Sequence, residues 1–151
     1  MQILTKLYRG LIVVGDFLKP LFLLGVRLFW GWQFLKTGLG KFGDIHAIAN
    51  YFQSLSIPAP LLNAYLAAGT EVVCGFLLLI GFASRLASIP LMITMSVALL
   101  TAHRTATLAV LDDPVTFVNQ LPFTFLFAVL TIFVFGPGMF SIDALIKRFK
   151  G

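Results

Sequence analysis

Two charged side chains that stand inside apolar runs, Arg27 and Glu71, are the residues best placed to do chemistry. A charge near the centre of a bilayer costs at least about 2.5–3.5 kcal/mol, so a charge retained there needs a partner or a function. Helical spacing places Gly31 and Gly38 on the face of Arg27, and Gly75 on the face of Glu71. Because small residues line closely packed faces in membranes, we predict that Arg27 and Glu71 form an interior polar pair. The pair could fix the helix register or take part in function.

A second polar group is predicted at the far end of the first apolar run. Lys41 continues the same helix face, and we expect it close in depth to His103 and Asn119, which border the third and fourth apolar runs. Asp44 and His46 are near Lys41 in sequence. Such a cluster could bind an anionic headgroup, a quinone carbonyl or a metal, although ordinary interface residues in a wet loop give the same pattern. We take Lys41, His103 and Asn119 as candidate ligand-binding residues and assign no metal ligand.

Residue counts exclude several kinds of chemistry. The single cysteine, Cys74, allows no internal disulfide, no CxxC redox pair and no cysteine-ligated zinc or iron–sulfur site. His46 falls in a loop, so no second intramembrane histidine can oppose His103 across a haem. The sequence has no Walker loop, dinucleotide fingerprint, nucleophile elbow or HExxH. We therefore expect neither haem nor an iron–sulfur cluster, and we identify no self-contained catalytic motif.

The composition indicates that lipid is the solvent of this chain. Of its 151 residues, 59% are hydrophobic and only 11% are charged, a more apolar balance than soluble domains show. Apolar runs predict transmembrane helices at 21–42, 61–82, 86–102 and 121–135, after an amphipathic interfacial helix at 3–18. We expect Lys19-Pro20 to open the first span, since proline suits a first helical turn. The predicted fold is all-α, a four-helix transmembrane bundle that forms one domain over 1–151.

Basic residues at the ends of these runs predict the orientation. Cytoplasmic loops carry an excess of Lys and Arg, so the richer side is expected to be cytoplasmic, with both termini on it. The formal net charge of +5 does not indicate nucleic acid, because the cations flank apolar runs and form no stripe. The richer side carries Lys6, Arg9, Lys19, Arg85, Lys147, Arg148 and Lys150, against Lys36, Lys41 and Arg104 on the other.

Short motifs in a fixed order give a resemblance to a known family. The matching pieces are Arg27 with Gly31, Gly38-Leu39-Gly40-Lys41, Leu55-Ser56-Ile57-Pro58, the run from Glu71 to Gly81 with Arg85, Gly136-Pro137-Gly138, and Ser141-Ile142-Asp143. At these positions, over roughly 21–143, the sequence resembles the DoxX family of small bacterial membrane proteins. The resemblance implies a four-helix bundle in the inner membrane, related in architecture to the DoxD-like subunits of thiosulfate:quinone oxidoreductase. It also implies a role beside oxidoreductases, in handling reactive oxygen or sulfur species. Relatives with quinone-linked thiol chemistry use paired cysteines, whereas this chain has one.

Three functional hypotheses follow. The leading one is a DoxX-like subunit that binds a quinone or lipid-like ligand, or a partner oxidoreductase, with quinone as the candidate cofactor. The first alternative is a small transporter or proton-conducting module, since Glu and Arg inside a bundle can line a proton or anion path. The second is a structural or assembly factor without a ligand. The expected partners are membrane lipid, an oxidoreductase subunit and further copies of the chain, and no nucleic acid.

Overall fold

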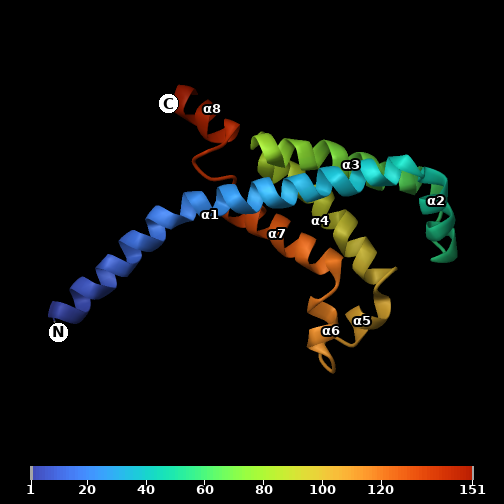
Figure 1. The fold of residues 1–151 in the computed structure, drawn as a ribbon, viewed down its shortest axis with the longest axis horizontal. Coiled ribbons are helices and arrows are strands. Elements are labelled where there is room, and N and C mark those ends of the chain that lie inside the picture. The colour runs from blue at the N-terminus through green and yellow to red at the C-terminus, as the bar shows by residue number, and fades with distance from the viewer. Residues whose placement is uncertain (1, 151) are drawn as a thin grey trace.

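A computed structural model describes residues 2–150, and the described chain is helical, which confirms the predicted all-α class (Figure 1). Its elements are α1 (Gln2–Gly43), α2 (Ile45–Ser54), α3 (Pro60–Ile80), α4 (Ser84–Leu100), α5 (Arg104–Leu108), α6 (Pro114–Val118), α7 (Leu121–Phe135) and α8 (Ile142–Lys150). The second, third and fourth predicted spans correspond to α3, α4 and α7, with ends that agree to within about two residues. The chain between α4 and α7 contains the short helices α5 and α6.

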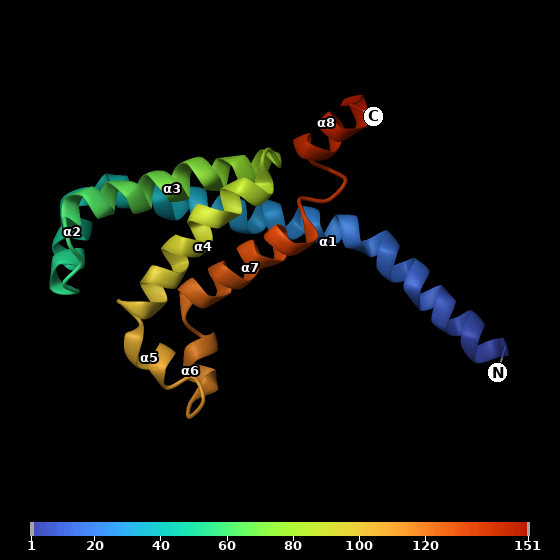
Figure 2. The same ribbon diagram turned by 180° about the vertical axis from the view of Figure 1, so that it is seen from behind.

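The predicted boundary at Lys19-Pro20 is wrong, because α1 is one continuous helix of 42 residues with Pro20 inside it. At 1.5 Å per residue it is roughly 63 Å long, more than a bilayer is thick. Its N-terminal part projects beyond the other helices and runs at an angle to the rest of α1 (Figures 1 and 2), as expected where a proline removes a helical hydrogen bond. Leu11 and Phe17 there are more than two-thirds exposed. That this segment lies on the membrane surface stays a prediction.

The second half of α1 packs against α3 along a seam of glycines. A Cβ atom placed on Gly75 would lie 2.8 Å from the backbone nitrogen of Leu35, and one on Gly38 would lie 2.8 Å from the backbone nitrogen of Val72. Such contacts are shorter than side chains tolerate, so the two backbones touch only because these positions have no side chain. The helices are antiparallel, since Gly31 faces 75–79 and Gly38 faces 68–72.

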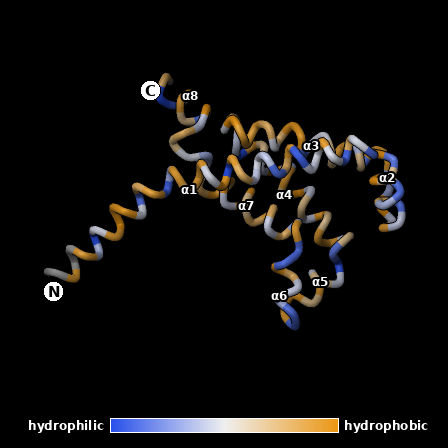
Figure 3. The backbone as a smooth tube through the Cα atoms, viewed as in Figure 1, coloured by the Kyte–Doolittle hydropathy of each residue, from blue (hydrophilic) through white to orange (hydrophobic). Residues whose placement is uncertain are grey.

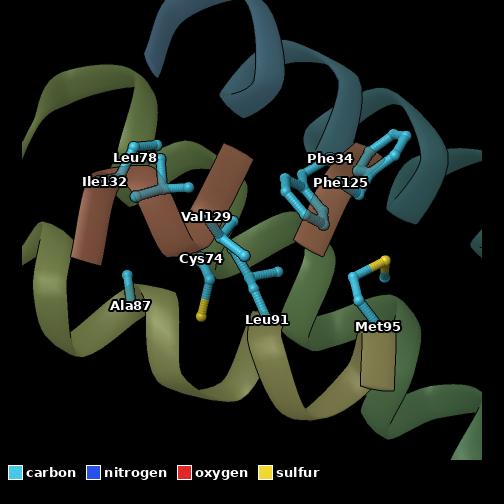
Figure 4. Close-up of a cluster of buried hydrophobic side chains, with 9 residues drawn as sticks. All are labelled: Phe34, Cys74, Leu78, Ala87, Leu91, Met95, Phe125, Val129 and Ile132. Carbon is cyan, nitrogen blue, oxygen red and sulfur yellow. The ribbon is translucent and has the colours of Figure 1, made fainter. Parts of the chain in front are cut away.

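An apolar core joins α1 and α3 to α4 and α7. Figure 4 shows its buried side chains, which are Phe34 from α1, Cys74 and Leu78 from α3, Ala87, Leu91 and Met95 from α4, and Phe125, Val129 and Ile132 from α7. Phe34 and Phe125 meet edge to face with ring centroids 4.6 Å apart, a favoured aromatic geometry. Cys74 is a buried packing residue here. Hydrophobic residues also run along the projecting part of α1 (Figure 3).

Length and hydropathy single out α3 among the described helices as the one able to cross a membrane unaided. The apolar helices α4 and α7 have 17 and 15 residues, which at 1.5 Å per residue is roughly 26 and 23 Å, somewhat less than a typical hydrocarbon core. The second half of α1 carries Arg27 and Lys36 in its apolar run.

Candidate functional site

Glu71 lies in α3 with only 1% of its surface exposed, and its partner is Lys41 from the end of α1. The Lys41 ammonium donates to Oε1 of the Glu71 carboxylate. The second carboxylate oxygen, Oε2, is buried and accepts no hydrogen bond from any described residue. Carboxylate oxygens are strong acceptors, so an orphaned buried one is a place where a ligand's donor can bind.

The glycine seam explains why Lys41 reaches Glu71. Gly38, one turn before Lys41, lets α1 lie directly on the backbone of Ala68 and Val72, which flank Glu71. Beyond the pair, α2 closes this end of the seam by packing Ile45 and Ala49 onto the small residues Ala64 and Ala68 of α3. The Lys41 side chain is still 26% exposed, so the pair is open on one side.

Arg27 does not pair with Glu71, and this prediction is corrected. Arg27 is 3% exposed, and its guanidinium donates to the backbone carbonyl of Pro137 at 2.8 Å and to that of Phe140 at 2.5 Å. The glycine seam sets a register in which the position opposite Arg27 is Gly81, about ten residues or 15 Å along α3 from Glu71. Both charges are interior, as predicted, but they belong to two separate sites.

Arg27 forms part of a C-terminal clamp, which comprises Arg27, Gly81, Ser141 and Asp143. Gly81 ends α3 with φ of 71°, and a Cβ there would lie 2.6 Å from both Nη1 of Arg27 and Cβ of Ser141, so only glycine fits. The backbone nitrogen of Asp143 donates to the Gly81 carbonyl at 2.9 Å. The Asp143 carboxylate accepts hydrogen bonds from the backbone nitrogens of Ala83 at 2.7 Å and Ser84 at 2.9 Å, at the start of α4. The clamp ties α1, the α3–α4 turn and the C-terminal segment together.

Of the clamp residues the sequence indicated only Arg27 as a site residue, although Gly81, Ser141 and Asp143 all stand in the motifs quoted above. Because a carboxylate that caps an N-terminal turn contributes about 1 kcal/mol, Asp143→Ala is expected to lower the free energy of unfolding by that amount. Asp16→Ala removes a nearby exposed carboxylate for which the structure records no hydrogen bond with a described residue, so it should change stability by less than about 0.5 kcal/mol. Thermal unfolding in detergent compares the two, and equal effects would mean that the cap contributes nothing.

The structure does not bring the other two predicted ligand residues to Lys41. His103 precedes α5, half-buried, and Asn119 follows α6, exposed. Figures 1 and 2 place the α5–α6 pair at a different end of the molecule from α2, which adjoins Lys41. His103 and Asn119 lie away from Lys41 because α4 and α7 run side by side and diverge from α3 towards the α5–α6 pair (Figures 1 and 2). In that loop Asp113 accepts hydrogen bonds from the side chain and backbone of Thr116, which lower the pKa of the Asp113 carboxyl.

Comparison with known proteins identifies the family of the chain. The family model named DoxX matches residues 22–104, which contain Arg27, Lys41, Glu71 and Arg85. The chain belongs to the DoxX family. This DoxX protein is 30% identical over 130 residues to an uncharacterized protein of Haemophilus influenzae, with 83% of each chain covered. It is 38% identical over 71 residues to an uncharacterized membrane protein of Mycobacterium tuberculosis, covering 46% of this chain and 44% of that one.

No solved structure matches this DoxX chain. Family membership and composition together identify it as a membrane protein, as the apolar sequence predicts. The family model ends before the C-terminal half of the clamp, and it covers both charged partners of the Glu71 site.

Proposed function

We propose that this DoxX protein is a multi-pass subunit of the bacterial cytoplasmic membrane that binds a quinone or quinol at the Lys41–Glu71 pair, beside a membrane oxidoreductase. The observation that carries the proposal is the Glu71 Oε2 atom, which is buried without a hydrogen-bond partner among the described residues. Ionisable residues retained inside a membrane bundle are functional far more often than neutral positions are.

The membrane placement of the proposal uses four crossing segments, which are the second half of α1, α3, α4 and α7. Their shared apolar core and the tight α3–α4 turn support this arrangement. Lys and Arg are concentrated at the ends of these segments where α1 enters, α3 turns into α4 and α8 follows α7. Under the positive-inside rule that end is cytoplasmic, with both termini on the cytoplasmic side. The Lys41–Glu71 pair then lies between the outer end of α1 and the middle of α3.

The chemistry of the pair fits the two forms of a quinone. A quinol hydroxyl can donate a hydrogen bond to the free Oε2 of Glu71, while the Lys41 ammonium can donate to a quinone carbonyl. The pair therefore offers an acceptor and a donor side by side, which suits a ligand whose oxygens alternate between hydroxyl and carbonyl. The partial exposure of Lys41 leaves a route to the site from the lipid phase. Because the chain has a single cysteine, the proposal includes no thiol exchange with the ligand.

Native mass spectrometry of the gently solubilised protein tests this function. We expect wild-type protein to retain a quinone and Glu71→Gln to lose at least about tenfold in occupancy, because the amide puts a donor where the acceptor stood. Lys36→Gln alters an exposed residue of α1, the helix that carries Lys41, and should retain the quinone. Wild-type protein that carries no quinone after reconstitution with a menaquinone or ubiquinone mixture would refute the proposal, as would equal retention by Glu71→Gln.

A further inference from the structure

A pocket of about 800 Å³ lies at the opposite end of the molecule from the Lys41–Glu71 pair. Its walls come from α1 around Lys19, the start of α4, the turn 136–139 after α7, and α8. The volume falls within the range of about 300–1,000 Å³ that is usual for small-ligand sites. One clamp residue, Asp143, lines the pocket, and its hydrogen bonds to Ala83 and Ser84 join the wall from α8 to the wall from the start of α4.

Three cations from distant parts of the sequence converge on this pocket. Lys19, Arg85 and Lys147 line it, and none of them forms an ion pair with a described residue. The pocket also contains two carboxylates, Asp16 and Asp143. The Asp143 carboxylate is already satisfied by two backbone nitrogens of α4. The positive charge of the pocket is therefore only partly balanced, and it attracts an anion.

Local contacts hold two of these cations in place. The Arg85 guanidinium lies beside Gly136 and donates one recorded hydrogen bond, from Nη2 to the Val134 carbonyl at 3.2 Å. An arginine has five N–H donors in a planar fork, so the others can bind phosphate oxygens in pairs. The Lys19 ammonium lies 5.8 Å from the centroid of the Phe135 ring, a cation–π contact that fixes its position without neutralising it.

The remaining lining of the pocket is apolar. Leu23, Leu86 and Ile146 border the cations, and Leu86 is among the exposed large hydrophobic residues of the structure. An inorganic anion has no apolar groups that could pack against this surface. The glycerol and first acyl carbons of a phospholipid can bury it, and that burial stabilises the bound lipid. Cations next to apolar surface at the end of membrane helices are the arrangement that binds lipid headgroups.

We propose that this pocket binds the phosphodiester headgroup of an anionic phospholipid, with Arg85 as the main phosphate ligand and Lys19 and Lys147 beside it. The site rests on the membrane placement proposed above and is independent of quinone binding. Because α1, α4 and α8 all line the pocket, a lipid bound there would also hold these helices together.

Native mass spectrometry with added lipid tests the proposal. Phosphatidylglycerol and phosphatidylcholine with identical acyl chains are titrated separately onto the purified protein. We expect phosphatidylglycerol to bind at least about fivefold more tightly, and Arg85→Ala to weaken it about fivefold, which is the effect of one basic residue near a membrane surface. Arg104→Ala, at the other end of the molecule, should leave binding unchanged. Arg85→Lys, which keeps the charge, replaces Arg85→Ala if that variant does not fold, with an expected loss of about twofold to threefold.

Two further measurements distinguish a phospholipid from a free phosphate as the ligand, and this proposal from the quinone proposal. Glycerol 3-phosphate carries the same phosphate without acyl chains, and we expect it not to displace the lipid; binding as tight as that of phosphatidylglycerol would overturn the lipid assignment. Glu71→Gln should bind phosphatidylglycerol normally, so failure of the quinone proposal would not affect this one. The phospholipid proposal would also be overturned by equal affinity for the two lipids. A loss of phosphatidylglycerol affinity in Arg104→Ala as large as that in Arg85→Ala would overturn it too.

Discussion

Replacing Lys41 with methionine is expected to lower the free energy of unfolding by about 3 kcal/mol, because it leaves the Glu71 carboxylate buried without a partner. Removing one member of a buried ion pair costs about 3–5 kcal/mol. The lower end applies here because the Lys41 side chain is 26% exposed, so the pair is only partly removed from solvent. Unfolding by sodium dodecyl sulfate in mixed micelles, followed by circular dichroism, measures the change.

Lys36→Met is the matched control for this variant. Lys36 lies on the same helix, is exposed, and has no recorded ion pair with a described residue, so its replacement should change stability by less than about 0.5 kcal/mol. If Lys41→Met were no more destabilising than Lys36→Met, the ion pair would have no energetic role. The double variant Lys41→Met with Glu71→Leu should recover much of the loss, because a pair of apolar residues needs no compensation in the interior.

Gly75→Ala is expected to destabilise the protein by about 1–3 kcal/mol, the usual cost of overpacking a closely packed interface. Its Cβ would lie 2.8 Å from the backbone nitrogen of Leu35 and 3.0 Å from the carbonyl oxygen of Gly31. These atoms belong to a helix backbone and cannot rotate away, so α1 and α3 must separate. Gly38→Ala should behave in the same way, because its Cβ would meet the backbone of Ala68 and Val72 at 2.9 and 2.8 Å.

Each of these glycines has a control on its own helix. Gly69 in α3 and Gly40 in α1 have no neighbouring atom within 4 Å of a built Cβ. Alanine at these sites is expected to be neutral or to stabilise by up to about 1 kcal/mol, since alanine favours helix more than glycine does. Unfolding in mixed micelles compares the four variants. A Gly69→Ala loss equal to that of Gly75→Ala would show that the seam is not closely packed.

The sequence was informative about which helix faces turn inward. The spacing of Gly31 and Gly38 with Arg27, and of Gly75 with Glu71, predicted that these faces are buried, and the structure places all five residues in the interior. Helical periodicity carries that information because one face of a helix recurs every three to four residues. Helix ends were also predictable where proline or glycine stands at them, as at Pro60 and Gly136.

The partners of Arg27 and Glu71 could not be predicted from the depth of these two residues in the membrane alone. If the midpoints of the predicted spans 21–42 and 61–82 coincided, Arg27 would lie within about four residues of the depth of Glu71. The glycine contacts instead offset these midpoints by about five residues, so that Arg27 lies opposite Gly81. The signal that could have found the true partner is the seam itself, because matching Gly38 to the small residues around Glu71 also places Lys41 beside that carboxylate. The sequence pattern did not indicate the hydrogen-bond acceptors of Arg27, because they are backbone carbonyls more than 100 residues away along the chain.

Double-mutant cycles test most directly the central claim that Glu71 belongs with Lys41 and Arg27 with the C-terminal segment. The first cycle combines Lys41→Met with Glu71→Gln, and the second combines Arg27→Met with Glu71→Gln, with free energies of unfolding measured in mixed micelles. We expect a coupling of at least about 1 kcal/mol in the first cycle and less than about 0.5 kcal/mol in the second, as for residues without shared contacts. A second-cycle coupling as large as the first would contradict the claim.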